Sequence, residues 1–464
     1  RDLHSFPTRR SSDLRSLPAG PLVAFYGDDF TGSSAAMEVL AFAGLETILF
    51  LAPPSPERLA HFSHYRGIGI ASVARSRSPE WMDEHLPDAF DQLASTGAPI
   101  IHYKVCSTFD SAPHIGSIGR AAEIGQRRFQ GWIPLVASDL GMGRFQAFGN
   151  LFARADGIGY RLDRHPTMAT HPVTPMHEAD LGRHLAAQTR LPVGLVDFVT
   201  MKCGQADALL AREIERGMAI VSLDMLDLET QREAGRLIWE RGATQQFVLG
   251  SQGVERALIA YWQSSGLVPS TVATAQCSRV ERVAAVSGSV SPATAAQIRH
   301  ASAQGFEPIM LDAQLAIDAD LLAVEVRRVI DQGREALEQG RDPLIFTAAG
   351  PDDPHVAVFR EAVGASGVEI ATANDRLGSA LGDILSALVR QCNLRRVVIS
   401  GGDTSGHATS RLGIDALTAI APISPGVPLC RAHSLDPAID GLEIALKGGQ
   451  TGELDFFVTV RDRH

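Results

Sequence analysis

The sequence predicts an α/β protein of two domains, each built on a mainly parallel sheet flanked by helices. Short runs of β-branched and apolar residues alternate with helical stretches along nearly the whole chain, and this alternation is typical of parallel sheets. Glycine-containing turns follow several of the runs, at the strand ends where open α/β sheets bind ligands. The 464 residues exceed one typical hydrophobic core, which predicts more than one domain.

The composition limits the classes of function. Hydrophobic residues make up 45% of the chain and charged residues 20%, as in ordinary globular proteins. The formal net charge of −11 argues against a general affinity for nucleic acid. The sequence has no apolar run long enough to cross a bilayer. Its five cysteines stand far apart without a Cys-x-x-Cys pair, which is typical of reduced thiols in a cytoplasmic protein.

The first domain is predicted to cover residues 21–262. Residues 1–20 are polar and basic and lack the apolar segment of a signal peptide, so we interpret them as a non-native or disordered tail that is dispensable. Repeated prolines at 165–176 predict an irregular loop. Helices are expected at 33–43 and 254–261. Strands are expected at 22–26, 47–51, 67–73, 99–105, 193–198, 219–223 and 246–250, and a turn with a basic residue at 135–144.

An acidic turn, Gly27-Asp28-Asp29-Phe30-Thr31-Gly32, follows the first expected strand. Its carboxylates can accept hydrogen bonds from the hydroxyls of a polyol, and one of them can serve as a general base. The alternative is that Asp29 or Thr31 merely caps the following helix. Capping can coexist with function, so both interpretations stay open.

Polar side chains follow several expected strands and should share one rim of the sheet. Arg77 and Lys104 can clamp a carboxylate, and the alternative is plain surface charge, which we prefer for Arg75. Arg144 marks a further basic turn. The histidines lack the close spacing of zinc ligands, so we predict no metal ligands. The expected rim residues are Asp28, Asp29, Arg77, Lys104, Ser107 and Asp110.

The second domain is predicted to cover residues 282–464, after a linker at 263–281 that is rich in Ser, Thr, Pro and Gly. Its first strand, 282–286, leads into Ser287-Gly288-Ser289-Val290-Ser291-Pro292. We expect Ser291 to cap a helix at 293–304 and Pro292 to be its first residue. The turn before that helix is a candidate anion site. Further strands are expected at 308–311 and 343–346, with a helix at 318–339.

A second glycine turn, Ser400-Gly401-Gly402-Asp403-Thr404-Ser405-Gly406, follows a β-branched strand run at 397–399. Adjacent glycines let a ligand approach the main chain closely. A helix expected at 407–417 would point its positive end at the same place. The sequence therefore predicts an anion site here, and an ordinary strand–helix turn is the alternative.

A glycine-rich loop, Lys447-Gly448-Gly449-Gln450-Thr451-Gly452, follows downstream. A lysine beside free backbone N–H groups suits phosphate oxygens, although the spacing is not that of a P-loop. Taken alone, Lys447 is better interpreted as a solvated surface lysine.

Nine segments occur in an order that resembles the four-carbon acid sugar kinases, over about residues 22–457. They are FYGDDFTGSSAAME, YKVCSTFDS, Gly143-Arg144, HPVTPM, GSQGV, VSGSVSPATAAQI, SGGDTS, PGVP and LKGGQTG. The resemblance implies a two-domain kinase that uses ATP, with a sugar-acid-binding N-terminal domain and a nucleotide-binding C-terminal domain.

The resemblance also implies roles for residues that match the family's motifs. Asp28, Asp29, Thr31, Lys104, Ser107, Asp110 and Arg144 match its sugar-acid segments. Ser287, Gly288, Ser289, Gly401, Gly402, Asp403, Thr404, Lys447 and Gly449 match its nucleotide segments. The chain departs from the pattern at Val105, at residues 114–117 and at Gln450-Thr451. The last two departures lie near predicted sites and bear on which sugar acid is used.

Phosphoryl transfer requires in-line positioning and neutralisation of charge more than covalent chemistry. We expect ATP with Mg²⁺ on the glycine turns, and Arg77, Lys104 or Arg144 on the substrate carboxylate. Asp29, in preference to Asp28, is expected to accept the hydroxyl proton. Because water must be excluded, we expect the active site in the interdomain cleft.

Two other functions remain as alternatives at this point. A NAD(P)-dependent sugar-acid dehydrogenase would explain the glycine turns, but the sequence lacks a proper Gly-x-Gly-x-x-Gly with its downstream acid. A sugar-acid-binding protein without turnover is the other. The expected partner is a small-molecule sugar acid, with neither nucleic acid nor membrane, a cytoplasmic location, and a homodimer as an option.

Overall fold

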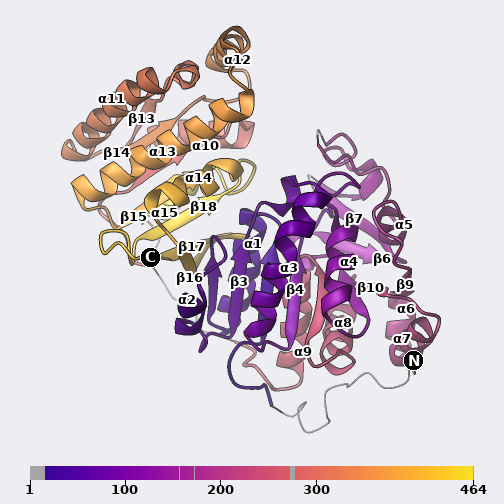
Figure 1. Cartoon of the computed structure of the whole chain (residues 1–464). Coiled ribbons are helices and arrows are strands. Elements are labelled where there is room, and N and C mark those ends of the chain that lie inside the picture. The colour runs from indigo at the N-terminus through magenta and orange to yellow at the C-terminus, as the bar shows by residue number, and fades with distance from the viewer. Residues whose placement is uncertain (1–15, 156, 172, 272–276, 463–464) are drawn as a thin grey trace. The chain divides into compact units, whose positions relative to one another are not determined.

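The computed structural model of the chain describes residues 16–155, 157–171, 173–271 and 277–462, apart from the side chain of Asp403. The chain divides into two compact units, Arg1–Val272 and Ala273–His464. Each unit contains a mainly parallel sheet with helices between its strands (Figure 1), so the predicted fold class is confirmed. Most of the predicted tail, and residues 272–276 of the predicted linker, lie outside the described residues.

The N-terminal sheet is wholly parallel in the order β2-β3-β1-β4-β11-β5-β10-β9. Strands β1, β3 and β4 are buried along their whole length, as expected for strands covered by helices on both faces. The strands are β1 (Val23–Gly27), β2 (Thr47–Phe50), β3 (Gly67–Ala71), β4 (Ile100–Lys104), β5 (Ile133–Val136), β9 (Val193–Val196), β10 (Ile220–Leu223) and β11 (Gln246–Gly250).

Helices connect these strands, as a parallel sheet requires. Helix α1 begins at Phe30 rather than at residue 33, because Asp29 caps its first turn. The helices are α1 (Phe30–Phe42), α2 (Pro56–His61), α3 (Pro79–Ser95), α4 (Ile118–Arg128), α5 (Leu181–Ala186), α6 (Phe198–Lys202), α7 (Ala206–Glu215), α8 (Leu228–Glu240) and α9 (Gly253–Ser264).

A small antiparallel sheet that the sequence did not predict follows β5. It consists of β6 (Arg144–Ala147), β7 (Asn150–Ala155) and β8 (Ile158–Arg161). Its first turn is fixed by buried Asp224, whose carboxylate accepts N–H bonds from Phe148 and Gly149 at 2.6 and 3.0 Å. Burial raises the pKa of Asp224 to about 6. This anchor lies some 75 residues away along the chain, which is why local patterns did not reveal it.

The C-terminal sheet has the order β13-β14-β12-β15-β18-β17-β16. The first five strands are parallel, and β17 pairs antiparallel with β16 and β18. The strands are β12 (Ala284–Ser287), β13 (Phe306–Met310), β14 (Asp342–Phe346), β15 (Arg396–Ser400), β16 (Ala416–Ser424), β17 (Val427–His433) and β18 (Glu443–Lys447). The helices are α10 (Pro292–Ser302), α11 (Ala319–Glu338), α12 (Pro354–Ser366), α13 (Ile370–Cys392), α14 (Gly402–Leu412) and α15 (Phe456–Asp462).

The predicted bounds of α10 and α14 can be compared with those in the structure. Ser291 caps α10 with Pro292 as its first residue, so that prediction is confirmed. The helix predicted at 407–417 is wrong at both ends. Helix α14 begins at Gly402 and ends before Gly413. Gly413 has a φ of 73°, a backbone conformation that glycine adopts more easily than other residues. Strand β16 then starts at Ala416.

One core cluster lies under α10 and α15 on the C-terminal sheet. Ala285, Val398 and Ala445, from three neighbouring strands, belong to the same buried cluster as Phe456 and Phe457 of α15. Side chains alternate along a strand, so the residue two positions further along each strand faces the same side. The last residues of β12, β15 and β18 therefore face the side of the sheet that carries this cluster.

Within the described residues, no helix combines the length and the apolar character that a bilayer crossing requires.

Arg396 is a fully buried cation that ties the start of β15 to its surroundings. Its guanidinium pairs with Glu443 at 2.6 Å and donates to the carbonyls of Val460 and Ser278 at 2.7 and 2.8 Å. Its neighbour Arg395 is exposed. One arginine of this adjacent pair is therefore structural, and the other is a matched control.

Replacing Arg396 with Ala should destabilise the C-terminal unit by about 3 kcal/mol or more, because a carboxylate and two carbonyls lose their partner. Arg395→Ala should stay within about 0.5 kcal/mol of the wild type. Urea unfolding followed by circular dichroism measures both. Equal effects of the two substitutions would contradict the structural role of Arg396.

Candidate functional site

The acidic turn between β1 and α1 is held by Arg75, in the 3-10 helix η1 (Ala74–Ser76). The Arg75 guanidinium donates from Nη2 to Asp28 Oδ1 at 2.8 Å and from Nε to Asp28 Oδ2 at 3.2 Å. Its Nη1 lies 3.0 Å from Asp29 Oδ2. The interpretation of Arg75 as plain surface charge is therefore wrong, because this cation pairs with both carboxylates of the turn.

The two aspartates differ in exposure. The side chain of Asp28 is 2% exposed and that of Asp29 is 25% exposed. Burial raises the pKa of Asp28, while the charge of Arg75 acts in the opposite direction. Asp29 Oδ1 accepts the N–H of Gly32 at 2.9 Å and caps α1, so the capping interpretation is confirmed. Asp29 is nevertheless the carboxylate that a ligand can reach.

Lys104 ends β4 beside this turn and is 1% exposed. A Cβ built on Gly32 would stand 2.1 Å from Lys104 Nζ, which places the ammonium group at the first turn of α1. In the part of the chain that the structure describes, Lys104 Nζ forms no ion pair with a carboxylate. A buried ammonium group without a protein counterion is suited to an anionic ligand.

The loop after β4 carries Asp110 close to the same cluster. Cys106 Sγ lies 2.9 Å from Thr108 Oγ1, and the Thr108 hydroxyl donates to Asp110 Oδ1. Phe109 between them adopts a φ of 58°, which is uncommon for a bulky residue. Burial raises the pKa of the Cys106 thiol, and the charge of Asp110 raises it further. The surroundings of Cys106 therefore favour the protonated thiol over the thiolate.

A histidine that the sequence did not single out holds this loop from the side. His184 Nε2 lies 2.8 Å from Ser111 Oγ and 2.9 Å from Gln188 Nε2. Burial lowers the pKa of His184 to about 4, so the ring is neutral at physiological pH. The loop is thus tied to α5, more than seventy residues later in the chain, and local sequence gave no signal for this contact.

The other predicted sugar-acid residues lie in different surroundings. Thr31 is half-buried in α1 and Ser107 is buried after β4. Arg77 is exposed, with its guanidinium 5.8 Å from the Trp81 ring centroid. Arg144 begins β6, and its Nη1 donates to the carbonyl of Met142 at 2.8 Å. The structure does not record a contact between Arg77 or Arg144 and the aspartates in the part of the chain it describes.

Asp139 is a further buried carboxylate, which follows β5, two strands from β4, and which sequence reasoning missed. Its Oδ2 accepts a hydrogen bond from Gln252 at 2.8 Å, and its Oδ1 lies 2.9 Å from Arg256 Nε. Gln252 belongs to the Gly-Ser-Gln-Gly turn after β11. A hydrogen bond therefore joins the polar segments after β5 and β11. Its two residues are over 110 positions apart, so no local sequence pattern indicates this contact.

The glycine turns of the C-terminal unit lie side by side because their strands are in register. Ser287 of β12 pairs with Ser400 of β15, and Ser400 pairs with Lys447 of β18. All three end parallel strands, so the turns that follow them share one edge. Ser400 Oγ is buried without a hydrogen-bond partner, as expected for a group that meets a ligand.

Lys447 is buried rather than solvated, so the surface interpretation is wrong. Its Nζ donates to Thr294 Oγ1 at 3.1 Å and to the carbonyl of Gly448 at 3.0 Å. Burial lowers the pKa of Lys447 to about 8. Among the described residues, this ammonium group has no carboxylate partner. It can therefore serve as a counterion for a phosphate.

Three glycines of this edge are crowded by side chains of the neighbouring turns. A Cβ on Gly288 would stand 2.2 Å from Thr404 Oγ1, and one on Gly449 would stand 2.4 Å from Ser289 Oγ. Gly401 has a φ of 124°, and a Cβ there would stand 2.8 Å from Thr404 Oγ1. Glycine is thus needed at these positions for the turns to meet.

Gly402 differs from these three. It is the exposed first residue of α14, and a Cβ there would meet no atom within 4 Å. Gly402 has no positive φ, unlike Gly401, so backbone strain restricts substitution at Gly401 only. Asp403 follows within the first turn of α14. The helix start at Gly402 is open to a ligand.

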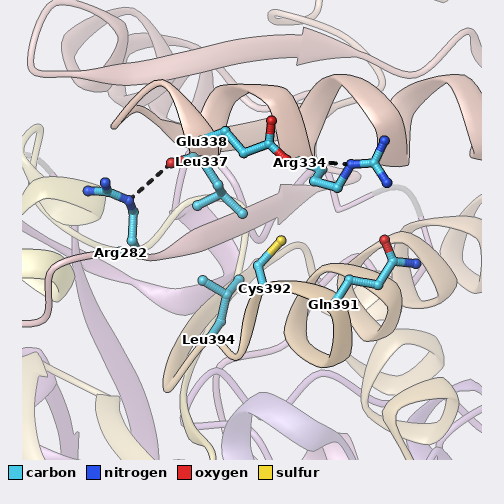
Figure 2. Close-up of a pocket in the computed structure, with 7 residues that line it drawn as sticks. All are labelled: Arg282, Arg334, Leu337, Glu338, Gln391, Cys392 and Leu394. Carbon is cyan, nitrogen blue, oxygen red and sulfur yellow. Dashed lines mark hydrogen bonds and ion pairs between the residues drawn. The ribbon is translucent and has the colours of Figure 1, made fainter.

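A separate hollow lies at the opposite, amino-terminal edge of the C-terminal sheet, between α11 and α13 (Figure 2). Arg282 Nε donates to the carbonyl of Leu337 at 3.2 Å, and Arg334 pairs with Asp331. The polar groups of both arginines are thus committed to the protein itself, and the hollow shows no convergent binding groups. It is lined by Arg282, Arg334, Leu337, Glu338, Gln391, Cys392 and Leu394.

No cluster of three or more His, Cys, Asp or Glu side chains capable of holding a metal ion occurs among the residues that the structure describes.

Known protein families match both halves of the chain. A family model described as the sugar-binding N-terminal domain matches residues 23–258. A model described as the nucleotide-binding C-terminal domain matches residues 284–457.

Individual relatives span nearly the full length. The chain is 48% identical over 446 residues to the 3-oxo-isoapionate kinase of Paraburkholderia graminis, which covers 96% of this chain and 95% of the relative. It is 31% identical over 442 residues to a 3-oxo-tetronate kinase of Methylobacterium radiotolerans, with 93% and 96% covered. A crystal structure of a Haemophilus influenzae protein has the same fold, with a TM-score of 0.72 at 22% identity over 94% of this chain and 98% of that one.

Replacing Gly402 with Val should leave the fold intact, because its Cβ meets no other atom, and should abolish measurable nucleotide binding. The branched side chain would occupy the open helix start where phosphates approach. Isothermal titration with an ATP analogue measures the affinity. Gly364→Val is the matched control, since Gly364 is also exposed, helical and free of neighbours within 4 Å. Wild-type affinity in Gly402→Val would remove this turn from the site.

Proposed function

The chain belongs to the four-carbon acid sugar kinase family, and on this premise we propose that it phosphorylates a hydroxyl of 3-oxo-isoapionate or a closely similar 3-oxo sugar acid with ATP. Kinase relatives across nearly the whole chain favour phosphoryl transfer over the dehydrogenase and the binding protein considered from the sequence. The 48% identity to a 3-oxo-isoapionate kinase, against about 30% for the 3-oxo-tetronate kinases, supports the choice of substrate.

The observation that carries the proposal is the in-register edge formed by Ser287, Ser400 and Lys447. It brings a helix start, a buried ammonium group and an unpartnered hydroxyl to one place. Polyphosphates are bound by such combinations of backbone N–H groups and cations. This edge suits the triphosphate of ATP.

The proposed nucleotide contacts use the turns already described. Lys447 would neutralise phosphate charge, and the N–H groups at the start of α14 would donate to phosphate oxygens. Mg²⁺ bound to the phosphates would neutralise further charge, as in other phosphoryl transfers. The proposed nucleotide residues are Ser287, Gly288, Ser289, Gly401, Gly402, Asp403, Thr404, Lys447 and Gly449.

The proposed sugar-acid contacts lie in the N-terminal unit. The buried ammonium group of Lys104, which forms no ion pair with a carboxylate within the described residues, would pair with the substrate carboxylate. Asp110 and Ser107, on the same loop, would accept or donate hydrogen bonds to substrate hydroxyls. Thr31, Arg77 and Arg144 remain proposed contacts.

Asp29 is the proposed proton acceptor, which its exposure favours over buried Asp28. The substrate hydroxyl oxygen would form a bond to the γ-phosphorus while the bond to the bridging oxygen breaks and ADP leaves with that electron pair. The hydroxyl proton would pass to a carboxylate oxygen of Asp29. Because the transition state is loose, Asp29 would act as much by orienting the hydroxyl as by removing its proton.

We place the enzyme in the cytoplasm, where ATP is available; none of its five cysteines forms a disulfide within the described structure, which agrees with a reducing compartment. A homodimer remains part of the proposal and can be tested by sedimentation equilibrium.

The function is tested by ADP release from ATP and Mg²⁺ in the presence of 3-oxo-isoapionate, 3-oxo-tetronate and the corresponding tetronates. We expect the highest kcat/KM with 3-oxo-isoapionate. A higher kcat/KM with 3-oxo-tetronate would overturn the proposed substrate. If none of the acids causes ADP release, the proposed kinase function is overturned.

Asp29→Asn should lower kcat by about 10²-fold or more, since a general base contributes 10²–10⁴-fold. ATP affinity and melting temperature should hardly change, because the amide keeps the shape of the side chain. Asp28→Asn should have a smaller effect on kcat. Steady-state kinetics of both variants decides between them. A dead Asp28→Asn beside an active Asp29→Asn would exchange the two roles, and two active variants would make Asp110 the next candidate.

A further inference from the structure

We propose that Arg75 is a positioning residue that keeps the carboxylates of Asp28 and Asp29 together and correctly oriented, and that Gly116 fixes the main chain of Arg75. The inference rests on the proposed function, because it concerns the acidic turn of the same reaction. It assigns roles to two residues that lie outside the nine segments of the family resemblance.

The side chain of Arg75 has few groups left for a substrate. Nε and Nη2 donate to Asp28, and Nη1 pairs with Asp29, at distances of 2.8 to 3.2 Å. Burial would lower the pKa of Arg75, but the charges of Asp28 and Asp29 raise it well above its ordinary value. Each of the three guanidinium nitrogens therefore already serves a carboxylate of the turn. Among the described residues of this cluster, Lys104 rather than Arg75 is the cation that forms no ion pair with a carboxylate.

The Arg75 guanidinium compensates the negative charge of the two carboxylates in the acidic turn. Two carboxylates on neighbouring residues repel each other, and without a counterion one of them holds a proton to a higher pH. Arg75 supplies a cation shared by both. The other charged or titratable groups that face the pair are Lys104 and Tyr103 of β4, and Cys106 and Asp110 of the following loop. Removal of Arg75 would leave Lys104 as the one nearby cation among these.

The main chain of Arg75 is held from two sides. Its N–H donates to the carbonyl of Asp28 at 3.0 Å. On the other side, Gly116 donates its N–H to the carbonyl of Arg77 at 2.9 Å. A Cβ on Gly116 would stand 2.5 Å from the Arg75 carbonyl oxygen, and its φ is 58°. A larger residue there must push the backbone of Arg75 away.

Gly116 lies in the stretch 114–117, where this chain departs from the family pattern. That stretch begins a few residues after Asp110 and packs on η1. A change of sequence in it can therefore alter the acidic turn without touching a substrate. This gives the departure a physical consequence, through the placement of Arg75.

Arg75→Gln tests the side chain. We expect kcat to fall by about 10²-fold, as for a small misplacement of catalytic groups, and the acidic limb of the kcat/KM profile to move up by about one pH unit or more. Arg75→Lys restores a cation, but an ammonium group cannot bind both carboxylates through separate nitrogens as a guanidinium does. It should return the acidic limb of the kcat/KM profile towards its wild-type position, while kcat stays low. ATP affinity, which belongs to the other unit, should not change in either variant.

Gly116→Ala tests the main-chain contact and does not alter any charge. It should lower kcat at least tenfold with little change in melting temperature beyond that of its control. The control is Gly97→Ala, because Gly97 has a similar φ of 73° but no atom within 4 Å of its Cβ position. Both variants carry the strain of alanine in this conformation, and Gly116→Ala alone carries the clash.

The results separate this inference from the proposed function. ADP release by the wild type, with an unchanged kcat and pH profile in Arg75→Gln or with equal effects of Gly116→Ala and Gly97→Ala, would overturn the role of Arg75 and Gly116 but leave the kinase standing. No turnover by the wild type with any sugar acid would overturn the function. If Arg75→Gln does not fold, the glycine pair alone decides.

Discussion

In both units the strands that bear polar turns are parallel, adjacent and in register. Gly27 of β1 is level with Ala71 of β3 and Lys104 of β4, and this is what puts Arg75, Lys104 and the acidic turn within reach of one another. The ends of β12, β15 and β18 are matched in the same way. Parallel pairing thus gathers residues from distant parts of the chain at one edge.

Charge compensation then decides what each edge can bind. At the N-terminal edge, two carboxylates face one guanidinium, and the remaining cation, Lys104, has no ion-pair partner among the described residues. At the C-terminal edge, buried Lys447 donates to hydroxyl and carbonyl oxygens and lies over the Phe456 ring, with no carboxylate partner among the described residues. Burying a cation without a carboxylate is costly. Both lysines therefore mark places where binding of an anion recovers part of that cost.

Glycines make the close approach of these turns possible in two different ways. Gly401 has a φ of 124°, and Gly288 and Gly449 leave room for hydroxyls of neighbouring turns. Gly402, in contrast, has an ordinary helical backbone and open space in front of it. The first three shape the turns, while Gly402 leaves room for a ligand. The sequence motifs contain the same residue type at all four positions, although the physical roles of these glycines differ.

The sequence alone determined the fold class, because the alternation of apolar strands and helices is a local property. It also determined the cap at Ser291 and the turns that carry Asp28, Lys104 and Gly401, since each is a short contiguous pattern. It could not place the small sheet β6–β8, because the anchor at Asp224 comes from a distant part of the chain. The end of α14 was missed for another reason, since Gly413 is a local stop signal that the prediction did not use.

Tertiary structure decided which charged residues pair. Arg75 and Arg77 look alike in sequence, but only the former is turned into the acidic pair by the contacts of η1 with Asp28 and Gly116. Lys447 looked like a surface residue and became a buried cation because β18 pairs inside the sheet. Burial and ion pairing depend on which elements become neighbours, and that follows from the whole chain rather than from any one segment of it.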